Sequence, residues 1–151
     1  MISDYVRAMR DRIGHDLLML PGVTAVIRYG ERFLLSRSAG SDVWSLIGGG
    51  VEPGEQPTDA VAREVREELG AGIRITGIVG AYGGESLVVE YPNGDRVAYV
   101  TTAYACEVVD KIQPDGEEIV EVGWFTASEI AGLDREPWID RVLADAVARV
   151  H

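Results

Sequence analysis

Hydrophobic positions at the start of the chain recur with helical spacing. Ile2, Val6, Met9 and Ile13 are separated by three or four residues, and charged residues fill most positions between them. This pattern predicts an amphipathic helix of about three turns that ends near Gly14. We therefore treat residues 1–20 as an N-terminal element that packs on the rest of the chain or on a partner.

Residues 21–151 are predicted to form a single domain of mixed strands and helices. Pro21-Gly22 predicts a turn, and apolar segments that contain many β-branched and aromatic residues follow it. The predicted strands cover residues 23–29, 33–35, 43–46, 73–82, 87–91, 97–106 and 119–125. Amphipathic segments at 57–69 and 138–150 predict helices, the second with Val150 on its apolar face. This order favours an α/β (α+β) fold with a mixed sheet between helices.

Composition narrows the classes of function. The 151 residues include 14 basic and 25 acidic side chains, for a net charge of −11. A nucleic-acid-binding protein needs a basic face, so we expect no nucleic-acid partner, whereas cation binding is compatible with this charge. No apolar segment is long enough to span a membrane and no signal peptide is recognisable, so we expect a cytoplasmic protein. Cys106 is the only cysteine, which excludes an internal disulfide.

The strongest chemical signal lies in residues 48–71. Three glycines precede an acidic turn and the predicted helix 57–69, which carries Glu64, Glu67 and Glu68. At about 100° per residue, these three carboxylates share one stripe of the helix, next to an apolar stripe that can face the core. Hard oxygen ligands on a rigid element suit Mg²⁺, and also Mn²⁺. Three glutamates are also typical of a solvated helix face, so this pattern alone leaves the metal site open.

The spacing of the whole stretch resembles a known family box. Gly49 is followed after five residues by Glu55, and after seven more by the sequence REVREELGA at residues 63–71. This arrangement is similar to the box of the Nudix (MutT-like) hydrolases at every fixed position. Ala71 is smaller than the usual last residue, and Ile47 stands upstream where a proline is common.

The resemblance implies a Nudix-type α/β/α sandwich and a reaction. Members of the family cleave a nucleoside diphosphate linked to a group X into a nucleoside monophosphate and phospho-X, by attack of a metal-activated water. Carried over by position, Glu64, Glu67, Glu68 and the carbonyl of Gly48 would bind the metal. Arg63 would orient Glu64, and Arg63, Glu64 and Glu67 would be catalytic.

The resemblance does not fix the general base. In many relatives this residue is a glutamate on a loop before the strand that ends in tryptophan. Glu118 is the first candidate in this chain, Glu117 is the second, and Glu64 could serve in their place.

The substrate is also left open. A proline that often marks ADP-ribose enzymes would fall at Ser86, and it is absent. Arg28 and Arg37 are candidates to contact a phosphate, and Tyr82, like other strand tyrosines, could stack on a base. The substrate would be a nucleotide sugar, an ADP-ribose-like compound or a relative. One alternative is a housecleaning enzyme for oxidised nucleoside triphosphates. Another is a non-catalytic nucleotide-binding domain. Many relatives are homodimers, so we expect a second subunit.

Overall fold

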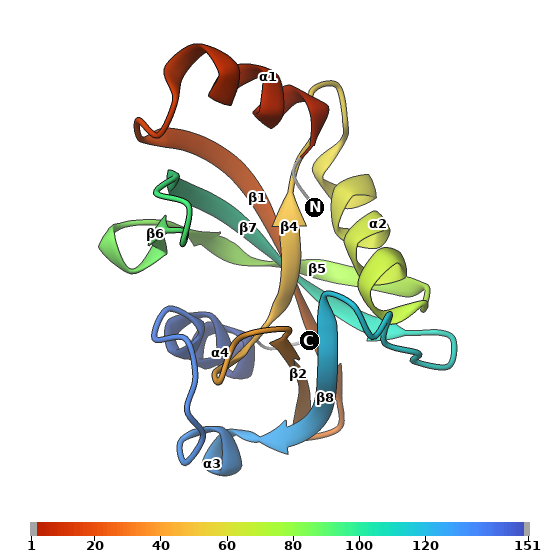
Figure 1. Ribbon diagram of the computed structural model, residues 1–151. Coiled ribbons are helices and arrows are strands. Elements are labelled where there is room, and N and C mark those ends of the chain that lie inside the picture. Colours follow the sequence, from red (N-terminus) through yellow and green to blue (C-terminus); the bar gives the residue numbers. More distant parts are fainter. Residues whose placement is uncertain (1–2, 150–151) are drawn as a thin grey trace.

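The strands of the sheet are arranged around the long strand β1, as the computed structural model of residues 3–149 shows (Figure 1). The elements are α1 (Asp4–Ile13), β1 (Leu18–Tyr29), β2 (Arg32–Ser38), β3 (Trp44–Ser45), β4 (Ile47–Gly50), α2 (Pro57–Leu69), β5 (Ile73–Tyr82), a 3₁₀ turn (Glu85–Leu87), β6 (Val88–Glu90), β7 (Arg96–Val108), β8 (Ile119–Thr126), α3 (Ala127–Ile130) and α4 (Ile139–Ala148). The predicted Ile2 and Val150 positions lie outside the described residues.

Strand β1 joins two parts of the eight-stranded mixed sheet. It runs parallel to β7, and on its other edge it pairs antiparallel with β4 in its middle, at residues 22–25, and with β2 at its end. Strands β5 and β6 extend the sheet beyond β7, while β3 and β8 flank β2. The sheet is therefore mixed, as predicted, and its one parallel pair is the central one.

Helices cover both faces of this sheet (Figure 1). Val23, Ala25 and Ile27 of β1 belong to the core cluster that includes the apolar stripe of α2. Val26 of β1 belongs to a second cluster, formed with the buried side of α4. Successive residues of a strand point to opposite faces, so β1 supplies both cores. The predicted α/β/α sandwich is confirmed.

The turn predicted at Pro21-Gly22 is wrong, because both residues lie inside β1. Proline normally interrupts a sheet because it lacks an N–H donor. Here Pro21 lies beside Val51, one residue past the end of β4, and its carbonyl accepts a hydrogen bond from the Val51 amide at 3.2 Å. Pro21 therefore stands at the end of the ladder between β1 and β4, where it contributes its carbonyl but no N–H donor.

Helix α1 forms where the sequence predicts it. Ser3 caps its first turn by accepting a hydrogen bond from the Val6 amide at 3.1 Å, and Gly14 ends it with a φ of 64°. No residue of α1 is buried, and Arg10 holds the helix in place by donating to the Arg96 carbonyl at 2.8 Å. Its packing against a second subunit stays a prediction. No helix within residues 3–149 is long and apolar enough to cross a membrane.

Candidate active site

Helix α2 fixes the three glutamates of the box at different depths. Pro57 starts it, and Gly70 ends it in the left-handed conformation with a φ of 64°, both as predicted. Its apolar stripe is fully buried, so the helix cannot rotate about its axis. The Glu68 residue is 9% exposed, and the side chains of Glu64 and Glu67 are 13% and 58% exposed. The acidic stripe therefore extends from the protein interior to solvent.

The guanidinium of Arg63 joins three segments of the chain. It binds both carboxylate oxygens of Glu55, with Nε and Nη2 at 2.8 and 2.9 Å. Its Nη1 donates to Glu64 at 2.9 Å and to Glu67 at 3.3 Å, and its Nη2 donates to the Gly50 carbonyl at 3.0 Å. A planar, five-donor guanidinium is suited to such a junction, and a lysine could not replace it. Arg63 therefore holds the turn, the helix and β4 in one arrangement.

The turn between β4 and α2 is closed by Glu55. Its Oε1 accepts a hydrogen bond from the Glu52 amide at 3.1 Å, while its own amide donates to the Glu52 carbonyl at 3.0 Å. The hydrogen bonds from Arg63 lower the pKa of Glu55. Glu55 is therefore held as a carboxylate and supports the turn.

Two of the three glycines are required by close contacts. A Cβ atom on Gly49 would lie 2.2 Å from Cδ of Glu64, and one on Gly48 would lie 2.3 Å from the Val23 carbonyl oxygen. A Cβ on Gly50 would meet nothing within 4 Å. The glycine run thus forms strand β4, which passes directly against β1 and under the Glu64 carboxylate.

The loop between β7 and β8 is fastened to the last turn of α2. The Gln113 amide donates to the Leu69 carbonyl at 2.6 Å, and the Asp115 amide donates to the Glu68 carbonyl at 3.1 Å. The Asp115 carboxylate in turn accepts a hydrogen bond from the Glu118 amide at 3.1 Å. The structure therefore brings the loop that carries Glu118 to the acidic side of α2.

Negative charge accumulates where these segments meet. Burial, and then the charges of Glu64, Glu118, Asp115 and Glu67, raise the pKa of Glu68 to about 8. Burial also raises the pKa of Glu64, although the hydrogen bond from Arg63 opposes this. Carboxylates placed this close are unfavourable unless protons or cations compensate them.

The donor set fits a hard divalent cation. Buried carboxylate oxygens beside strand carbonyls are the ligands that Mg²⁺ and Mn²⁺ prefer, and a cation would offset the charge around Glu68. As placed within residues 3–149, no group of three acidic, histidine or cysteine side chains stands ready to hold a metal. Arg63 bridges Glu64 and Glu67 instead, so metal binding would require the exposed Glu67 side chain to move.

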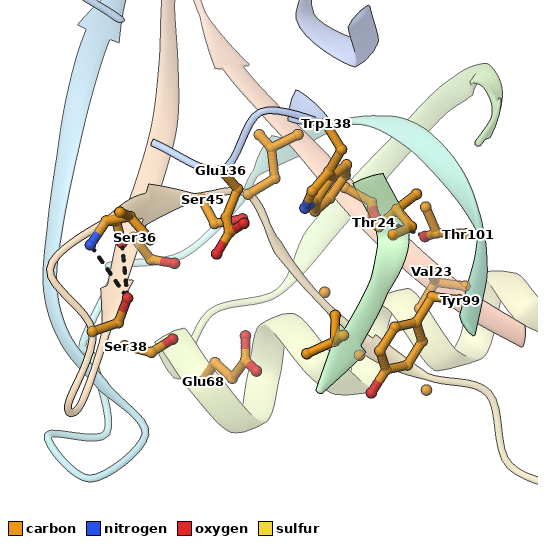
Figure 2. Close-up of a pocket in the computed structure, with 18 of the residues that line it drawn as sticks. Val23, Thr24, Ser36, Ser38, Ser45, Glu68, Tyr99, Thr101, Glu136 and Trp138 are labelled. Carbon is orange, nitrogen blue, oxygen red and sulfur yellow. Dashed lines mark hydrogen bonds between the residues drawn. The ribbon is translucent and has the colours of Figure 1, made fainter. Parts of the chain in front are cut away.

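A cleft of about 380 Å³ opens over this cluster (Figure 2). Its lining comes from β1, β2, β4, β7, α2 and the segment before α4, and its labelled residues are Val23, Thr24, Ser36, Ser38, Ser45, Glu68, Tyr99, Thr101, Glu136 and Trp138. The Glu68 and Glu136 carboxylates reach into it from opposite sides (Figure 2). This volume is in the usual range for a small-molecule site of about 300–1,000 Å³.

The structure does not bring Arg28, Arg37 or Tyr82 into this cleft. Arg28 lies over Phe33 in a second cavity of about 400 Å³, whose lining also includes Ala146 of α4. Arg37 is paired with a glutamate of β8, and it also donates to a loop carbonyl. The Tyr82 hydroxyl donates to an aspartate of α4 at 2.7 Å. These observed contacts hold the fold together.

Sequence reasoning missed several residues that line the cleft, among them Glu136 and Trp138. Residues 138–150 were predicted only as a helix, and Glu136 lies in an irregular segment before it. Their position depends on the pairing of this segment with β3, at the bridge between Trp44 and Arg135. No local pattern in the sequence encodes that contact.

Comparison with known proteins adds independent observations. The family model described as "NUDIX domain" matches residues 19–146. The nucleoside triphosphatase NudI of Enterobacter sp. (strain 638) is 32% identical over 94 residues, which are 60% of this chain and 67% of that protein. The NAD-capped RNA hydrolase NudC of Stutzerimonas stutzeri (strain A1501) is 29% identical over 88% of this chain, which spans only 46% of NudC. A crystal structure of a UDP-X diphosphatase superposes with a TM-score of 0.70 at 20% identity, over 97% of this chain and 72% of that one.

Proposed function

Because the chain belongs to the Nudix hydrolases, enzymes that act on pyrophosphate bonds, we propose that it is a magnesium-dependent pyrophosphohydrolase of a nucleoside diphosphate linked to a group X. The products are a nucleoside monophosphate and phospho-X. The observation that carries this proposal is the position of Glu68, with Gly48 and Gly49, in the lining of a nucleotide-sized cleft. The carboxylates of Glu64 and Glu67 adjoin it on the same helix.

In this proposal Glu64, Glu67, Glu68 and the Gly48 carbonyl hold the cation, Mg²⁺ or alternatively Mn²⁺. Such a cation neutralises a pyrophosphate and lowers the pKa of a bound water. The residues of the chain itself align the reacting groups. Arg63 keeps Glu64 against β4, and this fixed geometry reduces the cost of organising the reacting groups.

Glu118 is the proposed general base. Two observations support this role: its loop is fastened to α2, and its charge raises the pKa of both Glu64 and Glu68. Glu118→Gln is expected to lower kcat by about 10²- to 10⁴-fold with little change in KM, because general bases contribute a factor of this size.

Glu117→Gln is the matched control, since it removes the same charge from the neighbouring position. It is expected to keep kcat within about 3-fold, as a surface substitution away from the reaction does. Steady-state kinetics at saturating Mg²⁺ measure both. A large loss in the Glu117 variant alone would move the role to Glu117, and near-normal kcat in both would leave Glu64 as the base.

A substrate panel tests the proposed reaction. Nucleotide sugars, ADP-ribose, dinucleoside polyphosphates and normal and oxidised nucleoside triphosphates are each incubated with Mg²⁺ or Mn²⁺, and kcat/KM and the products are measured. We expect the highest kcat/KM for a nucleoside diphosphate linked to X, with the two monophosphate products. Pyrophosphate release from a triphosphate as the fastest reaction would contradict this.

Two other functions are distinguished by the same panel. A housecleaning hydrolase of oxidised nucleoside triphosphates is the second candidate, and the similarity to the nucleoside triphosphatase NudI favours it. A nucleotide-binding domain without activity is less well supported, because every glutamate of the box is retained. Nucleotide binding without any product under either metal would establish that function.

A further inference from the structure

The side of the cleft opposite α2 is built on a fixed backbone segment. The Trp44 amide donates to the Asp134 carbonyl at 2.9 Å, and the Glu136 amide donates back to the Trp44 carbonyl at 3.0 Å. Arg135 is held by both carboxylate oxygens of Asp140, at 2.7 and 3.0 Å. Residues 134–136 therefore act as an additional short strand beside β3, and Glu136 is held at the edge of the cleft.

The Glu136 carboxylate has no protein partner. Its residue is half-buried and lines the cleft, yet the side chain makes no hydrogen bond or ion pair with any other residue between positions 3 and 149. Because no buried side-chain oxygen within residues 3–149 lacks a partner, the Glu136 oxygens are open to the cleft and are available to accept hydrogen bonds from a ligand. The same negative charge repels phosphate, so this end of the cleft suits a neutral group that carries hydrogen-bond donors.

The neighbours of Glu136 define that group more closely. Trp138 lies beside it, and Ser36 and Ser45, which are cross-strand partners in β2 and β3, line the same cleft (Figure 2). An indole offers a flat face on which a base can stack, and hydroxyls can donate to ring acceptors. The site therefore suits a planar ring with donors on one edge and acceptors nearby.

Among the common bases, guanine alone can donate a hydrogen bond to each of the two oxygens of one carboxylate. Its N1–H and N2–H donors are adjacent, and its O6 and N7 atoms are acceptors that serine hydroxyls can satisfy. Adenine and cytosine place an unprotonated ring nitrogen next to their amino group, which a carboxylate repels. Uracil has a single N–H between two carbonyls.

We propose that Glu136 and Trp138 form a guanine-selective base site, so that the preferred substrate is a guanosine diphosphate linked to X. This inference rests on the proposed function for its catalytic readout. In the bound state, Glu136 accepts from N1–H and N2–H while the base stacks on Trp138, with the pyrophosphate directed towards Glu68.

The test uses substrates that differ only in their base. GDP-, ADP-, UDP- and CDP-glucose share one sugar and one pyrophosphate, so kcat/KM isolates recognition of the base. We expect GDP-glucose to exceed each of the others by about 10-fold or more, the discrimination that a bidentate contact provides. In Glu136→Gln the amide offers one donor and one acceptor, which complement adenine. The GDP- to ADP-glucose ratio is therefore expected to fall about 10- to 100-fold, mainly through KM.

Glu31→Gln, in the exposed hairpin turn after β1, is the matched control and should leave the ratio unchanged. A GDP- to ADP-glucose ratio of kcat/KM near one in the wild type would overturn the proposal, and so would an equal loss of kcat/KM for all four substrates in Glu136→Gln. The second outcome would place Glu136 on the ribose or the sugar.

Binding of products separates this proposal from the proposed function. Calorimetry with GMP, IMP and AMP needs no turnover, and IMP lacks only the N2 amino group of GMP. We expect GMP to bind about 10-fold more tightly than IMP in the wild type, and the two to bind alike in Glu136→Gln. This preference without hydrolysis of any nucleotide sugar would refute the proposed reaction alone, whereas hydrolysis without the preference would refute the base site alone.

Discussion

Glu68→Gln is expected to abolish turnover and, in metal-free protein, to raise the melting temperature. Glu68 is 9% exposed and surrounded by four other carboxylates, which raise its pKa together with burial. The amide keeps the shape of the side chain but carries no charge and binds a hard cation poorly. We expect kcat to fall by about 10³-fold or more, since the proposed metal site would lose a ligand.

The stability effect has a defined sign and pH range. The pKa of Glu68 rises from an ordinary value of 4.5 to about 8 in the folded chain. A carboxyl group with a raised pKa makes folding less favourable as the pH increases from the unfolded value to the folded one. Metal-free wild-type protein should therefore lose stability on this account between pH 4.5 and about 8. The Glu68→Gln variant should show no such loss. At pH 7 its free energy of unfolding should exceed that of the wild type by on the order of 2 kcal/mol, which raises the melting temperature by roughly 4–8 °C.

Thermal melts with EDTA and with Mg²⁺ measure this effect. Added Mg²⁺ should raise the wild-type melting temperature more than that of Glu68→Gln, because a ligand stabilises only the state that binds it. Glu67→Gln is the matched control. The Glu67 side chain is 58% exposed, and its contact with Arg63 is a surface ion pair. The Glu67→Gln variant should therefore lose activity with little change in metal-free stability. A lower metal-free melting temperature in Glu68→Gln would contradict this interpretation of the cluster.

Alanine substitutions along β4 are expected to separate stability from activity. In Gly48→Ala, the new methyl group would lie 2.3 Å from the Val23 carbonyl oxygen, which is backbone of the central strand. The two strands must move apart, so we expect a loss of about 2–4 kcal/mol in the free energy of unfolding. Gly49→Ala instead meets the end of a side chain, at 2.2 Å from Cδ of Glu64.

Glu64 can rotate away in Gly49→Ala, at a small cost in stability. It then leaves the position that Arg63 gives it, and kcat should fall by about 10²-fold or more, as small misplacements of reacting groups do. Gly50→Ala is the control, because its Cβ would meet nothing within 4 Å and its φ is not positive. Melting curves and kcat for the three variants test the series. Equal losses of activity at positions 49 and 50 would refute the role of the Gly49–Glu64 contact.

The ends and the buried side of helix α2 were predictable from the sequence because their signals are local. Pro57 and Gly70 mark both ends of α2, and the spacing of Val61, Val65 and Leu69 identifies its buried side. These signals act over a few residues, and the structure reproduces each of them.

The end of the cleft around Glu136 was not predictable in the same way. Residues 22–27 of β1 are all buried. The strand therefore has no alternation of polar and apolar side chains that would show which face of the sheet each residue points to. That is why Arg28 could be proposed near the phosphate when it lies in a different cavity. Glu136 is separated from its backbone partner Trp44 by more than half the chain, and only tertiary pairing makes it part of the cleft.

The position of β1 has a consequence for how such an enzyme can diversify. The middle of the strand pairs with β4, which carries the glycines of the proposed reaction centre, and its last residues pair with β2, which leads to β3 and the segment of Glu136. In the proposed enzyme, the chemistry and the choice of base therefore depend on separate stretches of the gene. Mutation can alter the residues around Glu136 generation after generation while selection preserves residues 48–71, so new substrates can arise without a new reaction.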